Sequence, residues 1–469
     1  MVEYRRVTDS FLNALESIAG KSHVLTARDD MAAYSGDEAC RAAGPLRSEP
    51  EVVVRPADAS EVARVLALAS DALVPVTPRG GGTGLSGGAV PARGGVVLSL
   101  DRMARIKEVD ERNFVAVVEP GVLLKDLQQA VEARGLCYPL YPGEKTAHVG
   151  GNVATNAGGM RAMKYGATKA WVLGLELALP TGDLIRTGGK LVKCSTGYNI
   201  TGLVAGSEGT LAVVTEATLR LTTPPLYEEA FLVPFSTLEQ AIGAVPDLIK
   251  ERVPLAGLEF LEKDALRLME AHLGREMPMR QHEAFLLGII EGGSQDDVLA
   301  AANRASEVCA THGSSDIYVA GSAKARRELL EARASLFHAV KRSGLIEIAD
   351  VVVPPSRIAE FIGKVKEISR RHGLPVLAYG HAGDGNVHLH PMGQGMDEGE
   401  WEQRLPGVME EMYRAGASLG GTVSGEHGLG SEKKKYLRLA VPPEQIELMK
   451  RIKTAFDPKG ILNPGKVFD

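Results

Sequence analysis

The stretch Pro78-Arg79-Gly80-Gly81-Gly82-Thr83-Gly84-Leu85-Ser86-Gly87-Gly88 decides the fold, and six of its eleven residues are glycine. Glycine accepts positive φ and close approach, so such a loop can turn successive backbone N–H groups toward an anion. Apolar runs at 73–76 and 95–100 flank it and are typical of buried strands. A flexible glycine-rich linker would contain serine and other polar residues and would lack these apolar flanking runs. The pattern therefore predicts a phosphate-binding loop held between two strands.

Residues 82–87 also match the G-x-G-x-x-G fingerprint of nicotinamide-dinucleotide domains, with Asp101 downstream. That fingerprint requires a helix directly after the glycines. Residues 88–95 read Gly-Ala-Val-Pro-Ala-Arg-Gly-Gly, and their proline and glycines prevent a helix of useful length. The context excludes a nicotinamide site here.

The composition is that of a globular protein of two or three domains, with 469 residues, 44% of them hydrophobic and 24% charged. The net charge of −6 lacks the excess of basic residues that is typical of nucleic-acid-binding proteins. The four cysteines are scattered without a C-x-x-C pair, which argues against an iron–sulfur cluster or structural zinc on this chain. No apolar run has the length of a membrane span and no signal peptide opens the chain. We expect a cytoplasmic protein, with membrane attachment through a partner as the alternative.

The chain divides at Pro224-Pro225, because two prolines interrupt both helix and sheet. Before it, apolar residues at helical spacing from Phe11 to Ala19 predict a helix that Gly20 ends. Beyond it, strand-like and helical segments alternate, which predicts an α+β domain with an antiparallel sheet. Its strands are expected at 229–234, 255–260 and 283–290, and its helices at 238–250, 264–273, 295–312 and 324–341. The expected divisions are 1–45, 46–224, 225–420 and 421–469.

Two further glycine-rich segments, 142–159 and 206–210, follow the first in order. Together the three resemble the vanillyl-alcohol-oxidase (PCMH) type of FAD-binding domain, over residues 47–223. The resemblance implies an FAD whose pyrophosphate lies against backbone N–H groups. Thr83 stands where relatives with covalent flavin have histidine, so we expect non-covalent FAD. Arg79 is either a charge partner beside the loop or a structural anchor. The residues assigned to FAD are Pro78, Arg79, Gly80, Gly81, Gly82, Thr83, Gly84, Ser86, Gly87, Pro142, Gly143, Gly150, Gly151, Asn152, Thr155, Asn156, Gly158, Gly159, Gly166, Glu208, Gly209, Val213, Val214 and Asn463.

The second half carries two histidine-rich motifs, Gly380-His381-Ala382-Gly383-Asp384-Gly385-Asn386-Val387-His388-Leu389-His390 and Ser424-Gly425-Glu426-His427-Gly428-Leu429-Gly430. With Asn463-Pro464-Gly465-Lys466 they resemble the FAD-linked D-2-hydroxy-acid dehydrogenases, a family that includes D-lactate dehydrogenase, the glycolate oxidase catalytic subunit and D-2-hydroxyglutarate dehydrogenase. The resemblance implies a FAD-binding domain at 46–224, a ferredoxin-like α+β cap at 225–420, and a segment at 421–469 that returns to the flavin.

These motifs hold four of the eleven histidines, and a His–His–Glu set is a reasonable site for a divalent metal. The resemblance assigns His381, His388 and Glu426 as ligands of zinc or manganese. In a strand at 387–391, alternate residues including Asn386, His388 and His390 share one face. The alternative is a polar network beside the flavin without a metal.

The resemblance also implies a reaction, the oxidation of a 2-hydroxy acid to the 2-oxo acid with hydride transfer to flavin N5. The metal would act as a Lewis acid and His427 as the general base. Arg333 would bind the substrate carboxylate, with Asn386 and His390 as further substrate contacts. The alternatives are a hydrogen bond from His427 to the flavin ring and a solvated surface role for Arg333. Ile348 stands where 2-hydroxyglutarate enzymes have lysine, which favours D-lactate or glycolate.

Several functions compete with this interpretation. D-2-hydroxyglutarate dehydrogenase is one, and a sugar- or lactone-oxidising flavoenzyme of the same domain family is another. A metal-dependent hydrolase and an inactive scaffold subunit belong to other classes. The absence of cysteine motifs implies a partner that takes the electrons: a quinone, an electron-transfer flavoprotein, a cytochrome or an iron–sulfur subunit. We expect a homo-oligomer or a larger complex.

Overall fold

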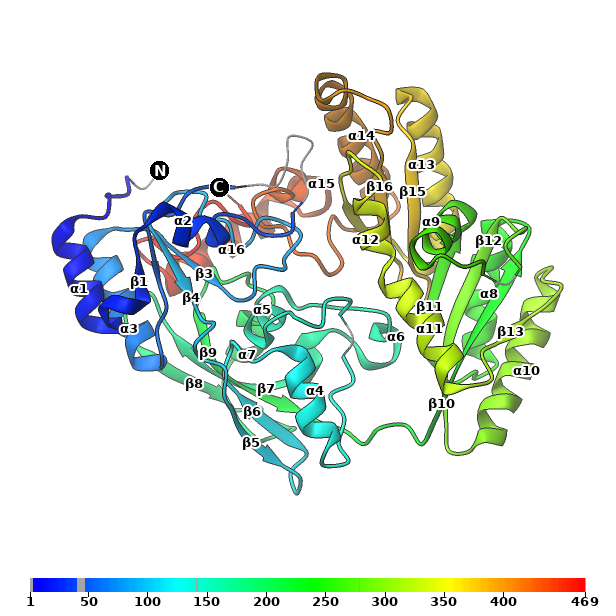
Figure 1. Cartoon of the computed structure of the whole chain (residues 1–469), viewed down its shortest axis with the longest axis horizontal. Coiled ribbons are helices and arrows are strands. Elements are labelled where there is room, and N and C mark those ends of the chain that lie inside the picture. Colours follow the sequence, from blue (N-terminus) through cyan, green and yellow to red (C-terminus); the bar gives the residue numbers. More distant parts are fainter. Residues whose placement is uncertain (1–2, 40–46, 141, 278, 469) are drawn as a thin grey trace.

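The computed structural model describes residues 3–39, 47–140, 142–277 and 279–468, which form helices around three β-sheets. This mixture confirms the predicted α+β class. The two smaller sheets lie in one half of the molecule, and the largest sheet lies with its helices in the other (Figure 1). Cys137, Cys194 and Cys309 are free thiols, and Cys40 lies outside the described residues.

The first sheet holds the stretch quoted above. Its strands β3(Val76–Arg79) and β4(Val96–Ser99) lie parallel and side by side, and the glycine-rich loop connects them. The predicted strand at 73–76 begins later than expected, because Leu73 ends the preceding helix with a left-handed backbone (φ 55°). No helix lies between residues 80 and 95, in agreement with the exclusion of a nicotinamide site. The strand order is β1(Val24–Leu25), β2(Val52–Val54), β4(Val96–Ser99) and β3(Val76–Arg79).

Two helices cover this sheet, and Leu15 and Leu66 pack from them against its buried valines. The first ends at Gly20, as predicted. The second begins at Asp58, whose carboxylate accepts the N–H of Glu61. The helices are α1(Asp9–Ala19) and α3(Ala59–Ala72), with the shorter α2(Arg28–Met31) between them.

The second sheet is antiparallel and buries one face under short helices, one of which lies in the second glycine-rich segment. The strand order is β5(Ile106–Asp110), β6(Val115–Val118), β9(Val213–Arg220), β7(Val172–Ala178) and β8(Leu184–Gly188). The helices of this region are α4(Leu124–Glu132), α5(Val149–Thr155), α6(Ala162–Tyr165) and α7(Ile200–Val204).

The third sheet is the predicted antiparallel one, and helices cover both of its faces. Its order is β13(Tyr318–Val319), β10(Tyr227–Phe235), β12(Ala284–Gly292), β11(Leu255–Glu262), β15(Val376–His381), β16(Asn386–Pro391) and β14(Ala349–Val352). One face packs against α8(Leu238–Lys250), α10(Gln295–Thr311), α13(Ile358–His372) and α14(Glu398–Ser418). The other packs against α9(Lys263–Leu273), α11(Ala323–Ala334) and α12(Leu336–Lys341).

The single helix predicted at 324–341 is divided into α11 and α12 at Ser335. The Ser335 hydroxyl donates to the carbonyl of Ala332 at 2.8 Å. Such side-chain bonds compete with regular helix bonding, which accounts for the interruption.

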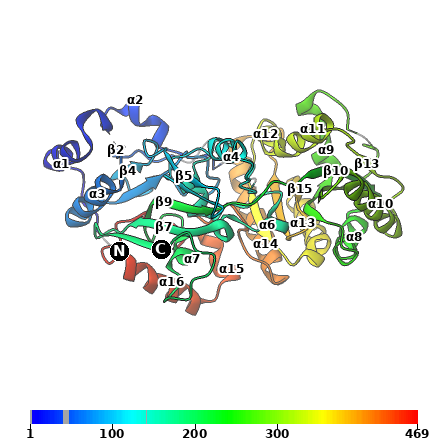
Figure 2. The same ribbon diagram turned by 90° about the horizontal axis from the view of Figure 1, so that it is seen from below.

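The end of the chain returns to the first sheet. After α15(Leu437–Ala440) and α16(Pro443–Phe456), the backbone of Leu462 bridges to Val76 of β3. Figure 2 shows α16 beside the first half from a second direction. The Tyr4 hydroxyl donates to the carbonyl of Gly460 at 2.8 Å, so the first and last described segments also lie together. In the part of the chain that the structure describes, five short 3-10 turns complete the fold: η1(Lys21–His23), η2(Ala32–Tyr34), η3(Thr168–Trp171), η4(Pro355–Arg357) and η5(Lys434–Tyr436).

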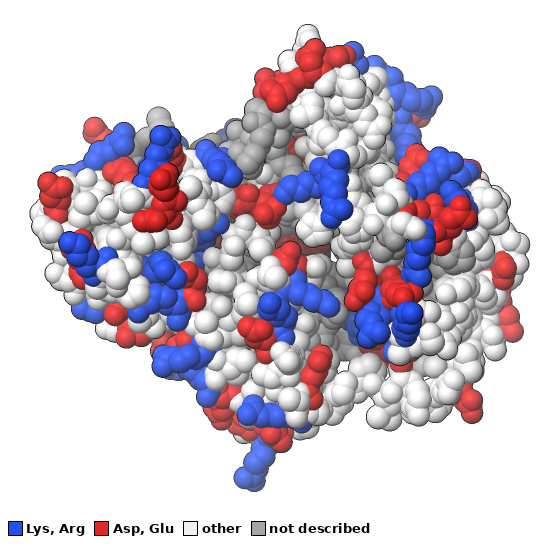
Figure 3. Space-filling model, in the orientation of Figure 1, with Lys and Arg blue, Asp and Glu red and all other residues white. Residues whose placement is uncertain are grey.

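Acidic and basic side chains are interspersed over the described surface that Figure 3 shows. This distribution is that of a chain whose acidic and basic residues nearly balance, at a net charge of −6. Among the described residues, every helix is too short or too polar to cross a membrane.

Candidate active site

The three glycine-rich segments and the third sheet enclose a cavity of about 460 Å³ between the two halves of the molecule. The third sheet and its helices contribute Arg333, Phe337, Ile348 and Tyr379. The histidine-rich motifs contribute His381, His388, Glu426 and His427. The predicted FAD residues on the lining are Pro78, Arg79, Gly80, Gly81, Gly82, Thr83, Gly84, Ser86, Pro142, Gly143, Gly150, Gly151, Asn152, Thr155, Gly158, Gly159, Glu208, Gly209, Val213 and Val214.

Gly87, Asn156, Gly166 and Asn463 are predicted FAD residues that do not line this cavity. Asn463 donates from Nδ2 to the carbonyls of Gly88 and Glu208, which ties the first loop to the third. The carbonyl of Gly87 accepts a bond from the Lys466 ammonium at 2.7 Å. Asn463 and Gly87 thus take part in hydrogen bonds that hold the glycine-rich loops in place, without lining the cavity.

The Arg79 guanidinium lies against the glycine-rich loop at Gly82 and donates to the backbone of a segment outside that loop. Nη1 donates to the carbonyl of Gly36 at 2.6 Å, and Nη2 donates to that of Ala33 at 2.9 Å. A Cβ at Gly82 would lie 2.1 Å from Nη2, so the loop passes directly over the arginine. These contacts are those of the structural anchor, one of the two roles expected for Arg79. An anion in the loop would meet backbone N–H groups instead.

Glu208 connects the third glycine-rich segment to the segment Ser424–Glu432, named here the histidine segment. Its carboxylate accepts the backbone N–H groups of Leu429 and Gly430, both at 2.7 Å. Its side chain therefore acts on the histidine segment, a role that the sequence did not indicate. Burial raises the pKa of Glu208, although these two N–H groups oppose the shift.

The first glycine-rich segment holds the histidine segment as well. The Ser86 hydroxyl donates to the carbonyl of His427 at 2.9 Å. A Cβ at Gly430 would lie 1.9 Å from the carbonyl oxygen of Ser86, and the φ of Gly430 is +49°. Only glycine permits so close an approach there.

His381, His388 and Glu426 form a compact triangle of possible ligand atoms. His381 is the last residue of β15, and His388 lies within β16. The hairpin of these two strands places the two Nε2 atoms 3.4 Å apart. Oε1 of Glu426 lies 3.5 Å from Nε2 of His381 and 3.4 Å from Nε2 of His388. Ligands at tetrahedral angles around zinc stand ~3.4 Å apart. Both the donor set and its spacing therefore fit a divalent metal.

The pKa values of the two histidines in this triangle shift in opposite directions. Burial disfavours the charged imidazole in both, but the Glu259 carboxylate beside His381 raises the pKa of that residue well above its usual value. Burial and the charge of His381 lower the pKa of His388 well below its usual value. A neutral His388 is the form that can ligate a metal.

Asp350 is a buried carboxylate that sequence reasoning missed, and it orders the histidine segment. Its Oδ2 accepts the backbone N–H groups of Gly425, Glu426 and His427 at 2.9–3.0 Å and the Ser424 hydroxyl at 2.8 Å. Its Oδ1 accepts Nδ2 of Asn386 at 2.7 Å. Four donors on one oxygen form an anion nest at the start of the histidine segment.

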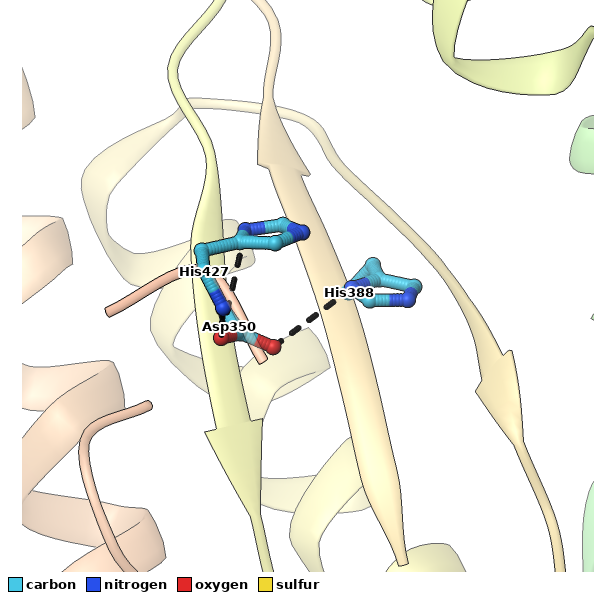
Figure 4. Close-up of side chains that lie close together, drawn as sticks. All are labelled: Asp350, His388 and His427. Carbon is cyan, nitrogen blue, oxygen red and sulfur yellow. Dashed lines mark hydrogen bonds and ion pairs between the residues drawn. The ribbon is translucent and has the colours of Figure 1, made fainter. Parts of the chain in front are cut away.

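Figure 4 shows Asp350 on β14 between His388 of β16 and His427. The carboxylate lies 3.7 Å from Nδ1 of His388 and 3.9 Å from Nδ1 of His427. These three residues could also form a metal site by proximity. The oxygens of Asp350 are already engaged by five donors, so the triangle that faces the cavity fits a metal better. Burial would raise the pKa of Asp350, but the neighbouring His427 and Lys433 lower it well below its usual value.

His427 lies on the cavity wall with its ring stacked on that of His388, at a centroid distance of 5.3 Å and an interplanar angle of 9°. Burial lowers the pKa of His427, which keeps the imidazole neutral. A neutral imidazole beside a cavity can accept a proton from a bound molecule.

Arg333 lies on α11 with 6% of its surface exposed and contacts the cavity. Its guanidinium stands over the Tyr379 ring at 4.7 Å, and Nη2 lies 2.6 Å from Oε2 of Glu259. The angle of that contact is poor for a hydrogen bond. Within the described chain, Nε and Nη2 therefore have no acceptor in good geometry. Such donors suit a carboxylate ligand.

Asn386 and His390, the other predicted substrate contacts, do not line the cavity. Asn386 donates to Asp350, and Nε2 of His390 lies 2.9 Å from the Tyr379 hydroxyl. Burial lowers the pKa of His390 to about 3, so it is neutral. In this arrangement the two residues support groups that reach the cavity.

Glu259 and Asp350 share a signal that could have found them in the sequence. Glu259 is the one charge in the apolar run 255–261, and Asp350 is the one charge in 348–354. A carboxylate in a buried strand is rarely retained without a partner.

Two family models match the chain. One, described as a FAD binding domain, matches residues 50–188. The other, described as the C-terminal domain of FAD linked oxidases, matches residues 225–467.

Curated relatives match over nearly the whole chain. A D-lactate dehydrogenase of Archaeoglobus fulgidus is 42% identical over 93% of this chain and 95% of its own. A D-lactate dehydrogenase of Anaerostipes hadrus is 38% identical over 99% and 98%. The glycolate oxidase subunit GlcD of Bacillus subtilis is 36% identical over 98% and 97%.

Among solved structures, p-cresol methylhydroxylase with substrate bound has a TM-score of 0.82 at 18% identity, covering 100% of this chain and 99% of that chain. At that identity the likeness concerns the fold, and it agrees with the vanillyl-alcohol-oxidase type of architecture expected from the glycine-rich segments.

Proposed function

Because the chain belongs to the FAD-linked oxidase family and is an oxidoreductase, we propose that it oxidises a small D-2-hydroxy acid, D-lactate or glycolate, to the 2-oxo acid. FAD would accept the hydride from the substrate's α carbon at N5, and a divalent metal would supply Lewis acidity toward the α-hydroxyl. The electrons would then pass to an acceptor other than NAD.

One observation carries this proposal: a His–His–Glu triangle whose spacing suits a divalent metal, a neutral histidine and an arginine with an open Nε donor line the same cavity as the glycine-rich loops. A 2-hydroxy acid needs each of these groups. Its carboxylate requires a cation, its hydroxyl requires a base, and its α carbon must face the flavin.

The chain's own residues divide this work. Arg333 binds the substrate carboxylate through Nε–H, which has no acceptor in the described chain, while Nη2 stays against Glu259. His427 takes the hydroxyl proton, and its stacking on His388 fixes the direction of its ring. His381, His388 and Glu426 hold the metal. The glycine-rich loops bind FAD without a covalent bond, since Thr83 stands at the position where covalent relatives have histidine.

The cavity favours a small substrate. Ile348 and Phe337 contribute apolar surface to it. An aliphatic side chain offers nothing to a second carboxylate, and burying an unpaired charge is costly. Two of the relatives above are named D-lactate dehydrogenase, and the third is a glycolate oxidase subunit. The latter name supports a partner subunit for onward electron transfer.

The test is flavin bleaching under anaerobic conditions. D-lactate, L-lactate, glycolate and D-2-hydroxyglutarate are added separately to the purified protein, each before and after chelation. We expect a yellow protein whose colour is released by acid precipitation, and bleaching by D-lactate or glycolate at a rate that chelation lowers at least about tenfold. Metal added back should restore the rate.

Other results would contradict the proposal in separate parts. Bleaching that survives complete metal removal would leave the His–His–Glu set a polar network. A yellow protein that only sugars or lactones bleach would favour the oxidases of those substrates. A protein that binds no FAD after reconstitution would refute the proposal at its first step.

A further inference from the structure

Glu259 is a carboxylate without exposed surface in the middle of β11. The register of β11 with β15 places it directly opposite His381, so the two side chains share a face. Oε1 lies 2.6 Å from Nδ1 of His381, and Oε2 lies 2.6 Å from Nη2 of Arg333. One carboxylate therefore contacts both a candidate metal ligand and the candidate substrate cation.

The contact with His381 orients the metal-binding nitrogen. When Nδ1–H donates to Glu259, the opposite nitrogen, Nε2, faces His388 and Glu426. A carboxylate behind a ligating histidine fixes both the ring rotation and the tautomer, and it makes the imidazole a better ligand.

The contact with Arg333 holds the guanidinium from one side, and the Tyr379 ring supports its face. Arginine has a long, flexible side chain, and fixing it before the substrate binds lowers the entropic cost of binding. Glu259 is also the counter-charge that permits a guanidinium to remain at 6% exposure.

We propose that Glu259 is a positioning residue that holds the metal-binding nitrogen of His381 and the carboxylate-binding guanidinium of Arg333 as one unit. The inference rests on the proposed function and adds to it a group that touches neither the substrate nor the metal. A merely structural buried charge would affect stability alone. A positioning residue changes the affinities for both metal and substrate.

The experiment uses the FAD-loaded full chain and compares the wild type with Glu259→Gln and Glu259→Asp. Glu262→Gln is the matched control, because Glu262 lies three residues along the same strand and pairs with Lys366 at 2.8 Å, outside the cavity. Zinc affinity is measured by competition with a chromogenic chelator. Affinity for the 2-hydroxy acid comes from the concentration dependence of flavin reduction at saturating metal.

For Glu259→Gln we expect the dissociation constant of zinc to rise about 10- to 100-fold. The apparent dissociation constant of the 2-hydroxy acid should also rise, by about tenfold or more. Glu259→Asp keeps the charge but is one methylene shorter and cannot reach both partners, so at least one of its two affinities should fall about tenfold. Glu262→Gln should change neither affinity by more than about threefold.

Unchanged zinc affinity in Glu259→Gln would overturn the inference, and so would a loss of zinc affinity with unchanged substrate affinity. If Glu259→Gln does not fold, two unchanged affinities in Glu259→Asp would overturn it equally. A wild-type protein that binds no zinc, or that no 2-hydroxy acid bleaches, would contradict the proposed function itself. The two failures are thus distinguishable.

Discussion

Ile348 illustrates how one side chain can decide which acid is oxidised. It is 3% exposed and lies on the cavity wall that also includes Arg333. Relatives that act on 2-hydroxyglutarate are expected to have lysine at this place, where it would pair with the distal carboxylate. An aliphatic residue leaves that carboxylate without a partner in a buried site.

We therefore predict that Ile348→Lys shifts the preference toward a dicarboxylate. The ratio of kcat/KM for D-2-hydroxyglutarate to that for D-lactate should rise about 10- to 100-fold, because a charge-assisted hydrogen bond contributes ~1.5–3 kcal/mol. Steady-state kinetics with an artificial acceptor measure the ratio. Ile348→Leu is the control and should leave it within about threefold. An unchanged ratio in the lysine variant would mean that the distal carboxylate binds elsewhere.

The histidine segment is an irregular element whose backbone requires partners, because an unpaired buried N–H is costly. Asp350 of β14 holds its first half, and Glu208 of the third glycine-rich segment holds its second. Carboxylates from the two halves of the molecule thus fix one segment. His427 faces the cavity because both ends of this segment are anchored.

Asp350→Asn tests this anchoring. Replacing one oxygen of Asp350 by an amide nitrogen brings a donor toward N–H groups, so bonds of the nest are lost or reversed. We expect kcat/KM for the hydroxy acid to fall about 100-fold or more, and the free energy of unfolding to fall by ~2–4 kcal/mol. FAD content, read from the visible spectrum, should persist. Asp247→Asn is the control: it removes an exposed partner of Lys250 and His312 and should leave the free energy of unfolding nearly unchanged. A fully active Asp350→Asn would contradict the anchoring role.

The two halves of the molecule also meet through an ionic cluster outside the cavity. The helix α6 lies beside the third sheet (Figure 1), and basic residues at its start and within it pair with carboxylates of β10 and β12. Glu291 on β12 contacts Arg161 at 3.1 Å and the Tyr165 hydroxyl at 2.6 Å, and also pairs with Lys164. The cavity lies between the same two halves.

We predict that Glu291→Gln weakens the contact between the halves. Three donors would share a neutral amide, so the free energy of unfolding should fall by ~2 kcal/mol and KM for the hydroxy acid should rise severalfold. Thermal unfolding and steady-state kinetics measure these effects. Glu283→Gln removes a 61% exposed carboxylate that pairs with Lys263, and should change both quantities little. Equal behaviour of the two variants would show that the cluster does not couple the halves.

Local patterns account for much of what the sequence predicted. The strands and helices of the third sheet follow from periodicity, and α8 was expected at its observed bounds, residues 238–250. The division of α11 from α12 was missed, because it depends on a single hydroxyl at Ser335. The later start of β3 depends on the left-handed backbone of Leu73, which no apolar pattern encodes.

The sequence alone indicated the class of fold and the three glycine-rich loops, because these follow from short segments and their order. The resemblance of its motifs to a known family singled out His381, His388 and Glu426. Only the tertiary structure decided that Arg79 bonds to the backbone of Ala33 and Gly36. It also decided that Glu208 and Asp350 hold the histidine segment. Asn386 and His390, finally, do not line the cavity. Glu259 and His381 stand 122 residues apart, and the register of β11 with β15 makes them partners. Such pairings arise from the packing of distant strands, which no local pattern specifies.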